Sequence, residues 1–327
     1  MKTKKVKIGF VGAGGIANHH ASRISNINEA EIVSVSDVEF EKAKKFAEKW
    51  GGKPFDSWEK MYRNTELDAV WICIPPFAHT NEVMEAAERG INIFIEKPIA
   101  LSLDLAKKME KAVMESGIIS WVGYHFRQSY SVRYVKDLLC KQGGNIGLLL
   151  GRWWGGIVGG PGHWWWKKEK SGGQIVEQAT HIYDLARFLA GDVVSVYAEI
   201  DKVMYEDLSE FTIEDVAATV LRFKNNAVGV ITNTSAAKKN GHKVEMEVVS
   251  RHLQTFLKGT HKAIIYGEKG MLEIESFNDP YFDEDYKFIK AVLSDCESEV
   301  PISEGVKTLE VTLAALEASL NKKVIYL

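Results

Sequence analysis

Residues 6–17 read Val-Lys-Ile-Gly-Phe-Val-Gly-Ala-Gly-Gly-Ile-Ala, a short apolar run that ends in the pattern Gly12-x-Gly14-x-x-Ala17. This pattern is typical of the turn between the first strand and the first helix of a dinucleotide-binding domain. The first glycine permits a tight turn, the second lets the backbone approach a pyrophosphate, and a small third residue lets the helix pack against the strand. The phosphates then bind at the N-terminus of that helix. The alternative is an ordinary strand-turn-helix whose glycines serve packing only.

A carboxylate follows the glycine turn at the distance that a dinucleotide site requires. Residues 31–37 read Glu-Ile-Val-Ser-Val-Ser-Asp, which predicts a second strand ending in Asp37. A carboxylate about 20 residues after the glycines binds the ribose hydroxyls of NAD and repels the additional phosphate of NADP. Val38 and Glu39 come next, so no arginine stands there to offset the repulsion. NAD is therefore the expected cofactor, and NADP is disfavoured.

The composition excludes several classes of protein. The chain has 327 residues, of which 46% are hydrophobic, and this is enough for two domains with cores of their own. The net charge of −3, with lysines and acids interspersed, gives no reason to expect a nucleic-acid partner. No apolar run approaches the length of a membrane span, so we expect no membrane association.

The cysteines and the first residues bear on the cellular compartment of the protein. Cys73, Cys140 and Cys296 are far apart and lack metal-ligand spacing, which predicts no metal site and a reducing, cytoplasmic compartment. The start, Met1-Lys-Thr-Lys-Lys, imitates a signal peptide, but cleavage after it would destroy the nucleotide turn. We therefore expect it to be part of the mature chain.

The pattern of predicted strands and helices changes near residue 126. Up to that point strand-like runs, including 67–74, 91–95 and 119–126, alternate with helical periodicity, which predicts a doubly wound parallel sheet of the Rossmann type over residues 1–126. Over residues 127–327 strands follow in near succession, which predicts an α/β domain with an open, mainly antiparallel sheet. These strands are expected at 193–205, 216–223, 227–234, 244–250, 252–258 and 271–274, with a hairpin turn at 224–227. An open sheet exposes an apolar face, so we expect a homodimer or homotetramer.

Two segments place polar side chains at the carboxyl edge of the first sheet, where such folds bind ligands. One is Ile74-Pro75-Pro76-Phe77-Ala78-His79, and the other is Glu96-Lys97-Pro98. His79 is alternatively a histidine at a helix N-terminus without a ligand, and Glu96 and Lys97 are alternatively a solvated pair. The proline after Lys97 fixes the turn, which favours a functional lysine.

A helix over residues 172–189 is predicted to carry a narrow polar stripe. Gln174, Glu177, His181 and Asp184 fall on one face of that helix, and its other faces are apolar. A histidine flanked by carboxylates is the usual composition of a general base near neutral pH. The alternatives are a solvated face and a hydrogen-bonded core histidine.

A loop rich in glycine and tryptophan is predicted from Trp153 to Trp166. Flat aromatic faces suit the apolar faces of sugar rings, and glycines let such a loop move over a ligand. Trp153 and Trp154 fit a subunit contact almost equally well.

These motifs occur in one order along the chain, together with Gly123-Tyr124-His125-Phe126-Arg127, and the whole chain resembles the Gfo/Idh/MocA oxidoreductase family. The resemblance implies a Rossmann domain followed by an α/β domain with an open sheet, NAD or NADP as redox partner, and sugars, cyclitols or their derivatives as substrates. It also implies that Lys97 and His181 are the catalytic lysine and histidine and that Asp184 contacts substrate. The chain departs from the usual family residues at four positions, namely Glu177 in place of aspartate, Ala179 and Ser171 in place of glycines, and His125 near a usual asparagine.

The resulting hypothesis is an NAD-dependent dehydrogenase that transfers hydride between a secondary alcohol of a sugar or cyclitol and nicotinamide. His181 takes the hydroxyl proton, Lys97 stabilises the alkoxide, and Glu177 orients the histidine. Two alternatives stay open, an NAD-dependent glycosidase on the same scaffold and a non-catalytic dinucleotide-binding regulator. The residues expected to bind cofactor are Gly12, Ala13, Gly14, Gly15, Ile16, Asp37, Ile74, Pro75, Pro76, His79, Glu96, Lys97 and His125. Those expected to bind substrate are Lys97, Tyr124, Arg127, Trp165, Trp166, Glu177, His181 and Asp184.

Overall fold

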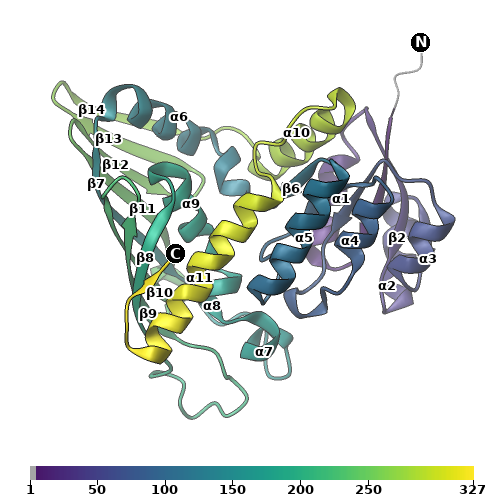
Figure 1. The fold of residues 1–327 in the computed structure, drawn as a ribbon, viewed down its shortest axis with the longest axis horizontal. Helices are drawn as coiled ribbons and strands as arrows, with labels where there is room; N and C mark the ends of the chain where they lie inside the picture. Colours follow the sequence, from purple (N-terminus) through teal and green to yellow (C-terminus); the bar gives the residue numbers. More distant parts are fainter. Residues whose placement is uncertain (1–4) are drawn as a thin grey trace. The chain divides into compact units, whose positions relative to one another are not determined.

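The computed structural model describes residues 5–327, so most of the segment Met1-Lys-Thr-Lys-Lys, which we expect in the mature chain, lies outside the described residues. The chain forms two compact units (Figure 1). The first unit comprises Met1–Gly123 and Tyr281–Val306, and the second comprises Tyr124–Pro280 and Lys307–Leu327. The predicted boundary after residue 126 assigned Tyr281–Val306 to the second domain, whereas the structure places this segment in the first unit.

The first unit contains a six-stranded parallel sheet in the order β3-β2-β1-β4-β5-β6, which confirms the predicted doubly wound fold. Its central strands are apolar throughout because helices cover both faces, and all four residues of β4 are buried. The short strand β3, which includes Pro54, was not predicted. The strands are β1 (Val6–Val11), β2 (Ala30–Ser36), β3 (Lys53–Phe55), β4 (Ala69–Ile72), β5 (Asn92–Ile95) and β6 (Ser120–Val122).

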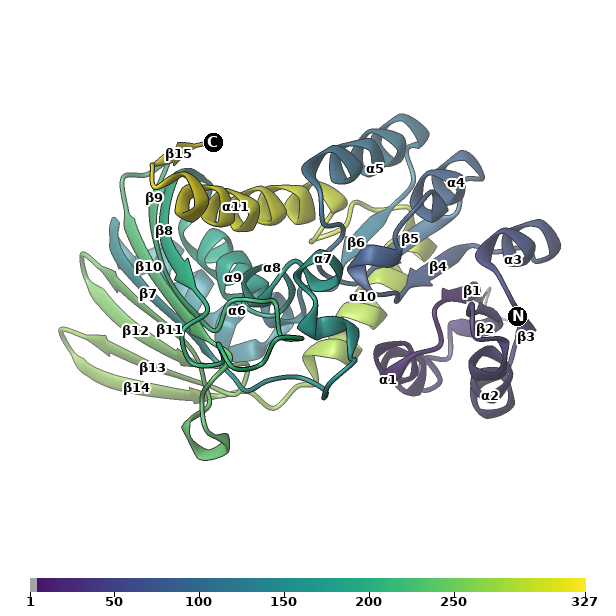
Figure 2. The same cartoon turned by 90° about the horizontal axis from the view of Figure 1, so that it is seen from below.

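Helices lie on both faces of this sheet, with α4 and α5 on one face and α1 and α10 on the other (Figure 2). The helix α10 explains why the chain returns to the first unit: the ring of Phe288 packs 5.1 Å from Trp71 and 5.9 Å from Phe94. The helices are α1 (Gly15–Ile24), α2 (Phe40–Trp50), α3 (Trp58–Asn64), the 3-10 turn η1 (Pro76–Ala78), α4 (Glu82–Glu88), α5 (Leu103–Ser116) and α10 (Pro280–Ser294).

The second unit contains a nine-stranded sheet in the order β14-β13-β12-β11-β7-β10-β9-β8-β15. Only β7 and β10 pair in parallel, which confirms the prediction of a mainly antiparallel sheet. The predicted hairpin turn is present, with Asn226 in the left-handed conformation at φ 70°. The strands are β7 (Ile146–Trp154), β8 (Val193–Asp201), β9 (Val216–Phe223), β10 (Val228–Thr234), β11 (Lys243–Ser250), β12 (Leu253–Lys258), β13 (Lys262–Gly267), β14 (Gly270–Glu275) and β15 (Ile325–Tyr326).

The inner face of this sheet packs against helices, and α9 contacts β7, β10 and β11. Burial alternates along β9, where Leu221 is buried and Val220 is 44% exposed, as expected when one face packs and the other is open. The helical elements of the second unit are η2 (His125–Gln128), α6 (Tyr130–Leu138), the π-helical turn η3 (Leu139–Gly143), η4 (Trp164–Trp166), α7 (Lys168–Ser171), α8 (Gln174–Glu177), α9 (Thr180–Ala190) and η5 (Lys239–Gly241), and α11 (Ile302–Asn321) spans both units.

Among residues 5–327, no helix combines the length and apolar character needed to cross a membrane. All three cysteines are free thiols, and Cys73 is buried.

Candidate functional site

The glycine turn of the first unit has the geometry that a pyrophosphate requires. Gly12 lies at φ 95°, and a Cβ there would stand 2.4 Å from the carbonyl oxygen of Cys73, so only glycine fits. Gly14 and Gly15 face open space, since an added Cβ would meet no heavy atom within 4 Å. No side chain caps α1, which begins at Gly15, and this leaves its N-terminal N–H groups for an anion. These residues therefore fit the diphosphate of a dinucleotide.

Asp37 lies beside this turn. Its Oδ2 accepts a hydrogen bond of 2.9 Å from the backbone N–H of Ala13, and its Oδ1 accepts one of 2.8 Å from the N–H of Glu39. The two bonds fix the carboxylate, and each oxygen keeps a lone pair for a ribose hydroxyl. The structure thus brings together the two parts of the predicted nucleotide motif. Ile16 follows in the first turn of α1.

A buried histidine and a buried glutamate bind each other where the loop after β4 leads into α4. The Nδ1 of His79 lies 2.5 Å from Oε1 of Glu82, and both side chains are almost inaccessible. Burial raises the pKa of Glu82, but hydrogen bonds from His79 and from the N–H of Thr80 outweigh it and hold that pKa below its usual value. The imidazole of His79 therefore fixes the start of α4, as in the alternative interpretation. Contacts of Ile74, Pro75, Pro76 and His79 with the cofactor stay predictions.

Glu96 is buried rather than part of a solvated pair. Its Oε1 accepts a hydrogen bond of 2.9 Å from Nε2 of His20, and its Oε2 accepts one of 3.1 Å from the backbone N–H of Lys97. Gly123 leaves room for this carboxylate, because a Cβ there would lie 2.9 Å from it. Lys97 is partly exposed and follows the carboxyl end of β5, as predicted. A direct contact of Glu96 with the cofactor stays a prediction.

In the second unit, aromatic rings surround the imidazole of His181, which is 5% exposed. It stacks on Phe126 with ring centres 4.9 Å apart and on Trp153 with centres 5.7 Å apart. The rings of His125 and Tyr124 meet it edge-on at 4.8 and 6.0 Å. The segment 124–126 therefore fixes the plane of the histidine ring. Trp153 was expected in a loop, but it lies in the strand β7.

Arg127 and Asp184 bind each other. The guanidinium Nε and Nη2 donate hydrogen bonds of 2.8 and 2.7 Å to the two carboxylate oxygens, and the hydroxyl of Thr308 donates a third of 3.1 Å to Oδ1. Asp184 has no exposed surface and Arg127 is 4% exposed. We expected both to contact substrate. In this structure the pair joins η2, α9 and α11, because the two opposite charges satisfy each other away from water, and the contact of either residue with substrate stays a prediction.

The polar stripe over residues 172–189 is interrupted, so the prediction of one continuous helix was wrong. The N–H of Ala179 donates to the carbonyl of Gln174, five residues back, and this widened turn separates α8 from α9. Glu177 is therefore the last residue of α8, and His181 is the second residue of α9. The Oε2 of Glu177 accepts a hydrogen bond of 2.7 Å from the indole of Trp165.

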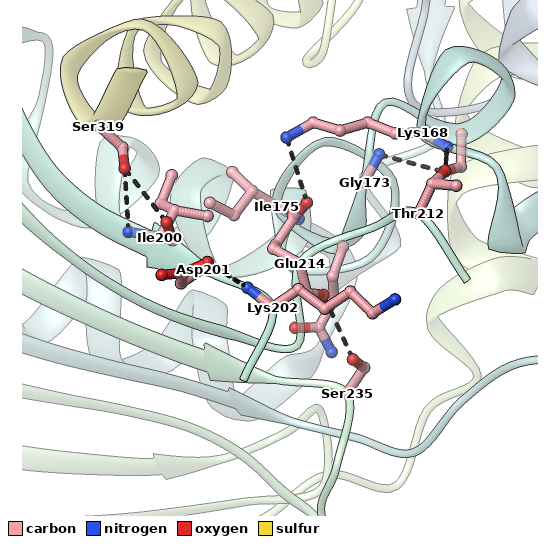
Figure 3. A network of polar contacts seen from close by, with 12 residues as sticks. Lys168, Gly173, Ile175, Ile200, Asp201, Lys202, Thr212, Glu214, Ser235 and Ser319 are labelled. Atoms are coloured by element: carbon pink, nitrogen blue, oxygen red, sulfur yellow. Dashed lines mark hydrogen bonds and ion pairs between the residues drawn. The ribbon is translucent and has the colours of Figure 1, made fainter. Parts of the chain in front are cut away.

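Sequence reasoning missed Glu214, a buried acid that fixes the start of α8 (Figure 3). Its Oε1 accepts a hydrogen bond of 3.0 Å from the N–H of Ile175, and Nζ of Lys168 lies 3.7 Å from its Oε2. Burial raises its pKa. A Cβ on Gly173, at φ 92°, would lie 2.3 Å from this carboxylate. The pair of glycines before α8 was thus the available signal that something approaches the backbone closely.

Trp165 and Trp166 do not present their faces to solvent. They are 1% and 7% exposed and form a hydrophobic cluster with Phe211 and Ile213. The indole of Trp166 also donates to the carbonyl of Val158 at 3.1 Å. These two tryptophans form the core of their own loop region, because Phe211 and Ile213 from a later segment cover them. This corrects the expectation that Trp165 and Trp166 would offer flat faces to a sugar.

Comparison with known proteins gives matches over both units. The model of an oxidoreductase family with an NAD-binding Rossmann fold matches residues 6–124, and the model of the GFO/IDH/MocA C-terminal domain matches residues 144–273. The myo-inositol 2-dehydrogenase of Thermotoga maritima is 26% identical over 97% of each chain. The scyllo-inositol 2-dehydrogenase (NAD(+)) of Bacillus subtilis is 26% identical over 97% of this chain and 95% of its own. A levoglucosan dehydrogenase solved with NADH has the same fold, with a TM-score of 0.92 at 18% identity over 99% of both chains.

Proposed function

Because the chain belongs to the Gfo/Idh/MocA family of NAD-binding oxidoreductases, we propose that it oxidises a secondary alcohol of a sugar, cyclitol or sugar derivative reversibly with NAD. The observation that carries the proposal is the imidazole of His181, nearly buried and packed against the rings of Phe126 and Trp153, in a chain whose first unit has the pyrophosphate turn and Asp37. The relatives named above, two inositol dehydrogenases and a levoglucosan dehydrogenase, support this substrate class.

We propose that the glycine turn and Asp37 hold NAD. When bound, NAD supplies the hydride acceptor, and this chain supplies proton transfer and charge stabilisation. His181 takes the proton of the substrate hydroxyl, and the stacked rings keep its plane fixed. The ammonium of Lys97 donates a hydrogen bond to the same oxygen and stabilises the negative charge that develops there. For Glu177 we propose an orienting role.

Lys97→Ala and His181→Ala test these roles. We expect each to lower turnover by about 10²- to 10⁴-fold, the usual contribution of one proton-transfer group. Affinity for NAD, measured by fluorescence titration of the same preparations, stays near that of the unaltered protein, because neither residue belongs to the glycine turn. Turnover is followed as NADH absorbance across a panel of inositols and sugars. Lys108→Ala and His252→Ala, at exposed positions, are the matched controls.

Three outcomes distinguish this proposal from its alternatives. Near-native turnover of His181→Ala, with NAD binding intact, refutes the assignment of the base. Release of a leaving group without net NADH identifies an NAD-dependent glycosidase. Binding of NAD with no turnover of any polyol in the panel, and with binding of a protein partner, identifies a regulator.

We further propose a cytoplasmic homodimer or homotetramer that forms through the open face of the second sheet. The apolar side chains of Val220, Val249, Tyr266 and Met271, at least 36% exposed, lie on that face on four different strands. A hollow of about 650 Å³ near the ends of β7–β10 is lined in part by Trp154. The cytoplasmic compartment is supported by the three free thiols, because disulfides are rare in a reducing compartment. Light scattering should give a mass above 36.7 kDa, and a sharp monomer at micromolar concentration contradicts the proposal.

A further inference from the structure

A buried charged cluster in the first unit lies next to the turn that carries Lys97. Its centre is His20 on α1, which has no exposed surface. The Nδ1 of His20 is 2.8 Å from Oδ1 of Asp285 on α10, and its Nε2 is 2.9 Å from Oε1 of Glu96. A ring that donates to a carboxylate at each nitrogen carries a proton on both, and two flanking acids favour this charged form of His20. Burial lowers its pKa, but Asp285 and Glu96 outweigh that effect and raise the pKa well above its usual value.

Glu96 connects this imidazolium to the backbone of Lys97. One oxygen of the Glu96 carboxylate accepts from His20, and the other accepts from the N–H of Lys97. Asp285 is itself fixed, because its Oδ1 also accepts a hydrogen bond of 2.8 Å from the indole of Trp71. A continuous chain of hydrogen bonds thus runs from α10 through His20 and Glu96 to the residue that we assign to the substrate oxygen.

The same histidine lies on the helix that begins at the glycine turn. His20 is in α1, which starts at Gly15. The ring of Phe94 in β5 meets its imidazole edge-on at 4.9 Å, so apolar packing holds the ring as well. One side chain therefore joins the helix that receives the diphosphate to the strand end that presents Lys97.

We propose that His20 is a positioning residue for Lys97, holding Glu96 so that the Lys97 backbone, and hence its ammonium, keeps one place at the carboxyl end of β5. This inference rests on the proposed function, in which Lys97 stabilises the alkoxide. A small displacement of such a group lowers the rate of the chemical step without changing how NAD binds.

Other groups face His20 from each element packed against it. Asp285 and Glu284 come from α10, Cys73 follows β4, and the rings of His19 and Tyr281 lie 6.4 and 5.8 Å away. Burial raises the pKa of Glu284 well above its usual value, and it also raises the pKa of Asp285, although His20 and the indole of Trp71 oppose that second effect.

The arrangement also has a rival interpretation, a divalent-metal site. Within the described residues, ligand atoms of His20, Glu96 and Glu284 lie within 4.8 Å of one another. Both nitrogens of His20 are already hydrogen-bonded to carboxylates, so the ring would have to give up one of these bonds to bind an ion. Hydrogen bonding therefore accounts for the observed geometry better, and metal binding becomes an outcome of the test.

His20→Gln in the full-length protein is the principal test. We expect kcat to fall by about 10- to 100-fold, the scale of a displaced functional group, while KM for the substrate and Kd for NAD change by no more than about twofold. Ile24→Ala, on the same helix and buried, is the matched control, because it leaves a cavity that lowers the melting temperature without touching Glu96. Its kcat should stay native. Glu96→Gln keeps the packing and an acceptor, and should lower kcat less than His20→Gln does.

The outcomes separate this inference from the proposed function. Near-native turnover of Lys97→Ala refutes the proposed function itself. If Lys97→Ala is inactive but His20→Gln and Glu96→Gln keep native kcat, or lose no more than Ile24→Ala at equal thermal stability, His20 is only structural and the inference fails. A stoichiometric divalent ion in the purified protein, absent from Glu284→Gln, also overturns it in favour of the metal site.

Discussion

Asp184→Asn tests whether the pair of Arg127 and Asp184 holds the second unit together or serves the substrate. Asparagine has the same size and keeps one acceptor oxygen, but it removes the charge that both guanidinium bonds depend on. Removing one partner of a buried ion pair typically costs about 3–5 kcal/mol. A folded protein is stable by about 5–15 kcal/mol, so the expected loss is a large part of the whole.

Counting the individual contacts of Asp184 gives a similar loss of the free energy of unfolding. Asparagine can accept one of the two guanidinium bonds, while its amide faces the other donor. One charge-assisted bond, worth about 1.5–3 kcal/mol, is therefore lost, and a buried donor is left unsatisfied at a further cost of about 1–3 kcal/mol. The hydroxyl of Thr308 donates a hydrogen bond of 3.1 Å to Asp184, and it can donate to the remaining oxygen of asparagine in the same way.

The assay is urea unfolding followed by tryptophan fluorescence, with turnover and KM measured on the same preparations. We expect Asp184→Asn to lower the free energy of unfolding by about 3–5 kcal/mol. The double variant Arg127→Met/Asp184→Leu, which removes both charges, should regain most of that stability and retain turnover, because apolar residues can replace a buried pair. If Asp184→Asn instead unfolds at the native urea concentration, loses substrate affinity, and the stable double variant stays inactive, Asp184 contacts substrate and the reasoning is wrong.

Two further predictions follow from the first unit. Asp37→Ser should narrow the preference for NAD over NADP in fluorescence titrations, because the carboxylate beside Ala13 repels the 2′-phosphate; equal affinity of the unaltered protein for both cofactors contradicts this. Burial raises the pKa of Glu284 well above its usual value, so the folded state favours the protonated acid. The stability that this protonated acid contributes is complete below the unfolded-state pKa near 4.5, and it is lost as the pH rises through the folded-state pKa. Glu284→Gln should therefore melt close to the unaltered protein at pH 5 and above it at pH 8, and the same difference at both pH values excludes this effect.

Local patterns predicted the parts of the molecule that depend on neighbouring residues. The turn at Gly12 and Gly14 was predictable because its glycines are required by backbone geometry within a few residues. The same holds for the hairpin at Asn226. Asp37 could be placed beside the glycine turn because parallel strands bring their carboxyl ends to one edge of a sheet. The position of Lys97 followed from the same rule.

Features that depend on distant partners were not predictable. Nothing near Asp184 in the sequence shows that Arg127, 57 residues earlier, neutralises it. The polar stripe assumed an uninterrupted helix, but the helix breaks before Thr180, where the N–H of Ala179 bonds to the carbonyl of Gln174. Trp165 was expected to be exposed because it lies in a loop rich in glycine, yet Phe211 covers it from another segment. For Asp184 and Trp165 the competing contact is tertiary, whereas the break before Thr180 is a widened turn of the backbone itself.

The return of Tyr281–Val306 to the first unit has a consequence for biosynthesis and for engineering. The nucleotide-binding unit cannot finish folding on the ribosome until almost the whole chain has emerged, since Phe288 and Asp285 complete the packing around Trp71. A fragment that ends at residue 126 would expose that tryptophan and leave His20 facing water on one side. Transplanting the N-terminal segment alone would therefore not transfer a complete nucleotide-binding unit. A chimera built to change cofactor specificity would also have to include α10 as a second, separate segment.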